Sequence, residues 1–119
     1  NLGIGYHIVE IAEIYKQFFA ISLCTAEDLP SPTIIGAQAA NELLNIKGIK
    51  ASFVLTDYQG KIYVSARSID EVNVQIIMER MGGGGHMNTA ACQMEGVGLV
   101  EAIGVLKHTI DDMLESGEI

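Results

Sequence analysis

The sequence predicts an α/β domain in which a single mixed β-sheet is packed with α-helices. Stretches with the two-residue period of a strand alternate along the chain with stretches of helical period. A hairpin signal stands in the middle of the chain. The 119 residues, 49% of them apolar, are enough for one hydrophobic core. Alternating elements around one hairpin favour a mixed sheet with helices packed on it.

The first segment has the spacing of an amphipathic helix. Its apolar residues recur every three or four positions, at Ile4, Ile8, Ile11, Tyr15 and Phe18. We expect this helix to end near Lys16, with residues 1–17 forming a linker helix ahead of a domain over residues 18–119. The apolar run Phe18–Cys24 then predicts a buried strand.

A loop over residues 25–32 leads into the second predicted helix. Ser31 suits its N-cap and Pro32 its first position. The residues expected on its apolar face are Ile35, Ala39 and Leu43, with Gln38, Asn41 and Glu42 facing water.

A β-hairpin is predicted next, with strands at Ala51–Thr56 and Lys61–Arg67. The connecting residues Asp57–Gly60 have Asp first and Gly fourth, which suits a type I turn. The two-residue period places Tyr63, Ser65 and Arg67 on one face of the second strand.

The last third of the chain predicts a short helix, a strand and a long helix. The short helix covers Asp70–Met81, with Ser68 or Asp70 as its cap and Gly82 as its end. Thr89–Met94 is the expected strand. The final helix carries an apolar stripe made of Leu99, Ile103, Leu106, Ile110 and Met113.

Composition narrows the classes of function. Seven basic and fifteen acidic residues give a net charge of −8, which argues against long nucleic acid as the preferred partner. Cys24 and Cys92 are expected to be buried free thiols, with a disulfide as the alternative. We expect no membrane contact by this chain, because no stretch approaches the roughly 18 apolar residues that a membrane span requires.

The run of four glycines before His86 is the main candidate for a binding element. Glycines allow positive φ and close approach of a ligand, and successive free N–H groups suit an anion. The imidazole adds a donor for a phosphate. We therefore predict a binding turn over residues 82–86, and a flexible spacer is the alternative.

Arg67 is the second candidate, because a guanidinium grips phosphate oxygens with parallel hydrogen bonds. Ser65 lies on the same predicted face, and Asn73 is a further donor with a local capping role as its alternative. For Arg67 the alternative is a surface salt bridge to Asp70 or Glu71. No metal-ligand spacing of Asp and His is present in the sequence, so we expect no metal site in this chain.

Taken together, the stretch SARSIDEVNVQIIMERMGGGGHMNTAACQ resembles the signature of DHHA1 domains. The resemblance covers about Phe18 to Leu114 and is greatest to the bacterial cyclic-di-AMP phosphodiesterases, as ELLNIKGIKASFVL also suggests. In that family DHHA1 accompanies a metal-binding DHH domain. Many relatives have a glycine after the paired alanines, where this chain has Cys92-Gln93, a form that fits the cyclic-dinucleotide subgroup.

The resemblance implies a substrate-binding role for one set of residues: Ser65, Arg67, Asn73, Gly83, Gly84, Gly85 and His86. It implies no catalytic residue in this chain. Mn²⁺ or a similar divalent ion is expected in the DHH domain of the same protein, and this chain by itself is expected to be inactive.

The implied function is to bind substrate in a phosphodiesterase that cleaves cyclic di-AMP to linear pApA. The implied partners are a cyclic or linear adenine dinucleotide and the DHH domain, with a homodimer as a further option. The implied location is the cytoplasmic side of a bacterial membrane to which the longer protein is anchored. Two alternatives remain: a single-stranded nucleic-acid-binding module of a RecJ-like exonuclease or oligoribonuclease, and a purely structural or dimerisation domain.

Overall fold

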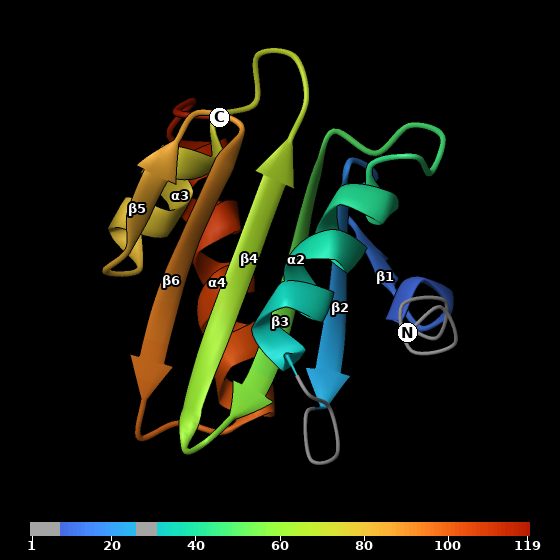
Figure 1. The fold of residues 1–119 in the computed structure, drawn as a ribbon. Helices are drawn as coiled ribbons and strands as arrows, with labels where there is room; N and C mark the ends of the chain where they lie inside the picture. Colours follow the sequence, from blue (N-terminus) through green and yellow to red (C-terminus); the bar gives the residue numbers. More distant parts are fainter. Residues whose placement is uncertain (1–7, 26–30) are drawn as a thin grey trace.

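The computed structural model describes residues 8–25 and 31–119, which form one six-stranded sheet with helices on both faces (Figure 1). The strands are β1 (Glu13–Tyr15), β2 (Phe19–Thr25), β3 (Ala51–Tyr58), β4 (Lys61–Ser68), β5 (Gly84–His86) and β6 (Thr89–Glu95). Their order is β1-β2-β3-β4-β6-β5. Strands β2 and β3 are parallel, and the other neighbouring pairs are antiparallel. The predicted fold class, a single mixed sheet packed with helices, is confirmed.

Helix α2 (Pro32–Leu43) is the crossover that joins the parallel strands β2 and β3. It begins where the sequence predicts, after Ser31 and with Pro32 in its first turn, although the Ser31 side chain makes no capping hydrogen bond. The predicted apolar face is confirmed, since Ile35, Ala39 and Leu43 are all buried. Residues 26–30 of the predicted loop lie outside the described residues.

The helix predicted to run to Lys16 is wrong at its C-terminal end. Residues 8–10 are helical, but Glu13–Tyr15 forms strand β1, which pairs with the edge of β2. Lys16 and Gln17 turn the chain with positive φ angles of 52° and 72°. Pairing with β2 outweighs the local helical period, because the edge of β2 offers backbone partners. Residues 1–7 of the predicted linker helix lie outside the described part, and the division at residues 17 and 18 stays a prediction.

The predicted hairpin is confirmed, but its turn differs from the predicted type I. Strands β3 and β4 extend to Tyr58 and Lys61, which pair with each other. The loop is therefore only Gln59-Gly60, with φ angles of 52° and 81°. Two positive φ angles are typical of a type I′ turn, whose twist matches that of the flanking strands.

Helix α3 (Val74–Arg80) is shorter than predicted. Its N-cap is Asn73, whose side-chain oxygen accepts hydrogen bonds from the backbone N–H groups of Gln75 and Ile76 at 2.9 and 3.3 Å. Ser68 does not cap it, because it is the last residue of β4 and its hydroxyl donates to the carbonyl of Val72. Asp70, the other predicted cap, instead has a φ of 56°.

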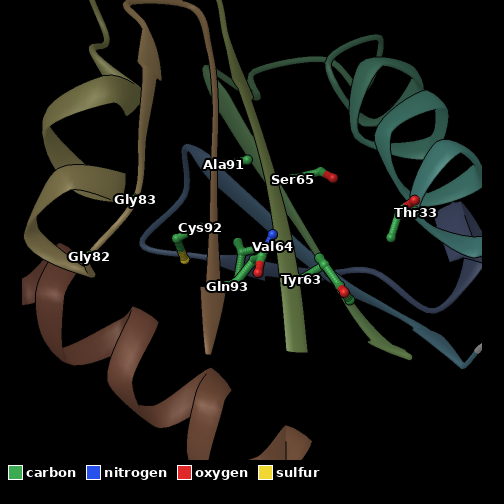
Figure 2. A pocket seen from close by; sticks show the side chains of 9 residues that line it. All are labelled: Thr33, Tyr63, Val64, Ser65, Gly82, Gly83, Ala91, Cys92 and Gln93. Carbon is green, nitrogen blue, oxygen red and sulfur yellow. The ribbon is translucent and has the colours of Figure 1, made fainter. Parts of the chain in front are cut away.

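The two faces of the sheet are covered differently (Figures 1 and 2). One face packs against α3 and the long helix α4 (Leu99–Glu115), whose predicted apolar stripe is confirmed in the larger core. The other face carries α2, which packs over β2, β3 and the near side of β4. In the described part of the chain, no helix combines the length and apolar character needed to cross a membrane.

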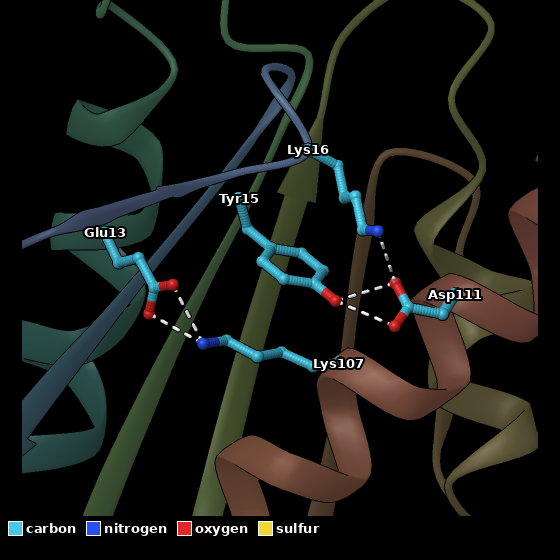
Figure 3. Close-up of polar contacts among 5 residues, drawn as sticks. All are labelled: Glu13, Tyr15, Lys16, Lys107 and Asp111. Carbon is cyan, nitrogen blue, oxygen red and sulfur yellow. Dashed lines mark hydrogen bonds and ion pairs between the residues drawn. The ribbon is translucent and has the colours of Figure 1, made fainter.

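Polar contacts attach β1 to α4 (Figure 3). The Tyr15 hydroxyl donates to the carboxylate of Asp111, with oxygen–oxygen distances of 2.7 and 2.8 Å. Lys107 lies 2.8 Å from a carboxylate oxygen of Glu13. The hydrogen bond to Asp111, with desolvation, raises the pKa of Tyr15 to about 12, because it stabilises the protonated phenol. This cluster holds the edge strand in the position that the sequence pattern does not predict.

We expect Tyr15→Phe to lower the free energy of unfolding by about 1 kcal/mol at pH 8, since it removes one hydrogen bond to a charged group. The unfolded tyrosine ionises near pH 10 and the folded one near 12. The stabilisation is therefore complete below pH 10 and is lost as the pH rises towards 12. Urea unfolding at pH 8 and pH 11.5 measures the difference between wild type and variant, with Tyr58→Phe as control. A difference that does not change with pH would contradict this assignment.

Candidate nucleotide-binding surface

Side chains from three neighbouring strands lie in rows across the face of the sheet that α2 leaves open. Arg67 of β4 pairs with Thr89 of β6, and Thr89 pairs with His86 of β5. Directly paired residues project from the same face of a sheet. Arg67 and His86 are therefore on one face, with two strand spacings, roughly 10 Å, between their backbones.

Two further rows continue this surface along the strands. The second contains Ser65, Ala91 and Gly84, and the third contains Tyr63 and Gln93. Successive rows are two residues apart, or roughly 7 Å. We call the surface made by these three rows the open shelf. Its residues on β6 are exposed and those on β4 are half-buried.

A pocket of about 400 Å³ lies on the open shelf beside α2 (Figure 2). It crosses β4 and β6, from Thr33 in the first turn of α2 to the corner at Gly82 and Gly83. The shelf residues that line it are Tyr63, Ser65, Ala91 and Gln93. This volume is within the usual range for pockets that bind small molecules.

Arg67 is half-buried and keeps most of its donors free for a ligand. Its Nη1 donates to the carbonyl of Ala66 at 3.0 Å. No ion pair to Arg67 exists within the described residues, and Asp70 pairs with Lys50 instead. Burial lowers the pKa of Arg67, although a guanidinium stays charged at neutral pH. A half-buried cation without a carboxylate partner suits an anionic ligand.

The first glycine of the run ends α3, as predicted. Gly82 has a φ of +91°. Its N–H donates to the carbonyl of Glu79, and the N–H of Gly83 donates to that of Met78. These two bonds are the Schellman motif, in which glycine takes the left-handed position after the helix.

The rest of the run differs from the predicted binding turn, because Gly84–His86 forms the edge strand β5. A Cβ on Gly83 would lie 2.1 Å from the carbonyl oxygen of Ala91, and one on Gly85 would lie 2.6 Å from the Cα of Ala90. Gly83 and Gly85 therefore allow the backbone to approach β6 closely. This contact also argues against a flexible spacer.

The structure brings together four of the predicted site residues: Ser65, Arg67, Gly84 and His86. Gly83 lies at the corner of the pocket. Gly85 pairs with Ala90, so it belongs to the α3 and α4 face of the sheet. Asn73 is not on the open shelf, and its side-chain oxygen Oδ1 accepts the hydrogen bonds that cap α3.

No metal centre is evident in the described part of the chain, where no three His, Cys, Asp or Glu side chains gather. Both cysteines are free and buried, as predicted. Burial raises the pKa of Cys92, which is one of the residues that line the pocket, to about 11. Its thiol is therefore protonated at neutral pH and is a poor nucleophile.

Three residues with hydroxyl or amide side chains line the pocket but were not among the predicted site residues: Thr33, Tyr63 and Gln93. The strand period indicates that Tyr63 shares a face with Ser65 and Arg67, which was a usable signal. Gln93 required the register between β4 and β6. Thr33 had no local signal, because only the packing of α2 brings it to the pocket.

Comparison with known proteins gives matches over most of the chain. The model of the DHHA1 domain matches residues 21–116. The cyclic-di-AMP phosphodiesterase PdeA of Listeria monocytogenes is 45% identical over 105 residues, which are 87% of this chain and 16% of that protein. The cyclic-di-AMP phosphodiesterase GdpP of Bacillus subtilis is 41% identical over 112 residues, which are 92% of this chain and 17% of that protein. The chain thus spans about a sixth of the length of these relatives.

A solved structure supports the fold at lower sequence identity. An exopolyphosphatase-related protein from Bacteroides fragilis superposes with a TM-score of 0.82 and 20% identity. The superposition covers 94% of this chain and 34% of the other. At this level of identity the likeness establishes the fold.

We expect Gly83→Ala to destabilise the protein by about 2–3 kcal/mol, because the new methyl group would collide with β6 backbone. Gly84→Ala is the matched control. Nothing lies within 4 Å of a Cβ at Gly84, so its effect should stay within about 0.5 kcal/mol. Thermal and urea unfolding measure both. Equal stability of the two variants would contradict the close approach of Gly83 to β6.

Proposed function

The chain belongs to the DHHA1 domain family, and from this premise we propose that its open shelf binds the nucleotide substrate of a cyclic-di-AMP phosphodiesterase. The main observation that supports this proposal is the row of Arg67, Thr89 and His86 beside an open pocket. A guanidinium, a hydroxyl and an imidazole are all donors for phosphate oxygens.

In this proposal the phosphate lies over the first row of the open shelf. Arg67 supplies a charge-assisted pair of hydrogen bonds, which are shorter and stronger than neutral ones. His86 is exposed on the neighbouring edge strand and donates from the other side. The two donors approach one phosphate from both sides of Thr89, which favours a fixed orientation of that phosphate.

The second row leaves room for the sugar. Ser65, Ala91 and Gly84 carry small side chains or none, so a ribose can lie against the strands here. The Ser65 hydroxyl offers a hydrogen bond to a sugar or phosphate oxygen. Gly83 at the corner of the pocket keeps this edge free of side chains.

The reaction we propose for the longer protein is hydrolysis of one phosphodiester bond of cyclic di-AMP. Water adds its oxygen to phosphorus, the bond to the ribose 3′ oxygen breaks, and that oxygen takes a proton to give linear pApA. Among residues 8–25 and 31–119 no cluster of side chains fits a metal site, and we assign this chain no step that a metal performs. Its contribution is to hold the substrate in position, which supplies a large part of many rate enhancements.

The partners and location follow from the same proposal. A DHH domain of the longer protein would hold the divalent ions and face the open shelf, on the cytoplasmic side of the membrane. The net charge of −8 favours a small anionic ligand over a long nucleic acid, which needs many basic contacts.

We expect Arg67→Ala in the full-length protein to weaken binding of pApA by about 10- to 100-fold, because it removes charge-assisted hydrogen bonds. Titration calorimetry without divalent metal measures the affinity. Arg80→Ala is the matched control, since Arg80 pairs with Glu118 away from the open shelf. Unchanged affinity in a folded Arg67→Ala protein would contradict binding of the nucleotide at the open shelf. Tighter binding of long single strands with a steep salt dependence would instead favour the exonuclease alternative.

We expect His86→Ala to lower kcat/KM for cyclic di-AMP by about tenfold or more in the full-length protein, with no change in Tm. His86 is exposed, so its side chain adds little to stability. The control is His108→Ala, which removes an exposed histidine from α4 on the other face of the sheet. Kinetics equal to those of the control would exclude His86 from the site.

A further inference from the structure

We infer that Tyr63 and Gln93, the third row of the open shelf, form a base-recognition pair that selects adenine. The inference rests on the proposed function and goes beyond it, because it assigns base selection to residues outside the glycine run and Arg67. Tyr63 and Gln93 pair directly between β4 and β6, and both line the pocket. Figure 2 shows them at one end of that pocket.

The spacing of the rows suits a nucleotide laid along the strands. The phosphate row at Arg67 and the Tyr63–Gln93 row are four residues apart on β4, or roughly 13 Å. The small residues Ser65 and Ala91 lie between them. A phosphate at one end and a base at the other would therefore be separated by a stretch where a sugar meets no large side chain.

The chemistry of the two side chains suits a purine. A tyrosine ring offers a face on which a base stacks. A glutamine amide can donate to N7 and accept from the N6 amino group of adenine at the same time. Guanine has two acceptors at the corresponding positions, so it matches the same amide less well. Gln93 is exposed, which leaves its amide open to the ligand.

The surroundings hold this pair in place. The Tyr63 ring packs against Tyr58 at 6.3 Å between ring centroids and 48° between planes. Thr33 of α2 lines the same pocket. Beyond the third row, Lys61 and Glu95 form an ion pair at 3.2 Å, which closes this end of the open shelf with a neutral pair. A base is thus favoured here over a second phosphate.

The test compares binding of linear pApA and pGpG to the full-length protein by titration calorimetry without divalent metal. Wild type should prefer pApA by roughly tenfold or more, and Gln93→Ala should lose that preference by weakening pApA selectively. Gln38→Ala, on the exposed side of α2, is the matched glutamine control. Tyr63→Ala should weaken both dinucleotides by roughly tenfold, and Tyr63→Phe should retain the affinity, because it keeps the stacking ring.

The outcomes separate this inference from the proposed function. If Gln93→Ala keeps the wild-type ratio of affinities while Arg67→Ala loses both ligands, base selection by Gln93 is wrong and the shelf still binds nucleotide. If wild type binds both dinucleotides equally, adenine selection at this row is wrong. If wild type binds neither dinucleotide, both the inference and the proposed function fail.

Discussion

The close contact between the glycine run and β6 positions the candidate site. Gly83 and Gly85 have no room for a Cβ, because the backbone of β6 occupies the space that it would need. Their approach lets residues 84–86 add a strand to the sheet, and that strand sets His86 opposite Thr89 and in line with Arg67. The glycines therefore have a structural reason that is independent of any ligand, and this reason also determines where the histidine lies.

Unequal coverage of the two faces makes the open shelf. Helices α3 and α4 together bury one face of β4 and β6 in the larger core. On the other face, the smaller core around α2 covers β2 and β3 and ends near β4. Gly36 allows α2 to approach β3, since a Cβ there would lie 2.5 Å from Thr56 Oγ1. The helix thus lies tightly over its own strands, and the surface beyond it stays accessible.

The charges of this acidic chain are arranged so that one cation is available at the open shelf. Lys50, Lys61 and Arg80 each pair with a carboxylate. Arg67, in contrast, has no carboxylate partner in residues 8–25 and 31–119. A half-buried cation without a partner loses part of its hydration, and a bound anion would offset that cost. The local charge, rather than the net charge, is therefore what matters for a small ligand.

The sequence by itself determined the features that depend on residues close together in the chain. The periods of α2, α4 and the β3–β4 hairpin predicted those elements, and Gly82 predicted the end of α3, because periodicity and left-handed φ are local properties. Residue type, the strand period of residues 61–67 and the glycine run also predicted Ser65, Arg67 and His86 as candidate site residues. Their juxtaposition on one face is a property of the sheet.

The tertiary structure alone decided the strand at Glu13–Tyr15, where pairing with β2 and contacts to α4 outweigh a helical pattern. It also decided the pairing of Tyr63 with Gln93 and the place of Thr33 at the pocket. These depend on the register between strands that are far apart in the chain and on where α2 lies. Such long-range contacts leave no periodic trace in the sequence, since each partner by itself fits several local structures.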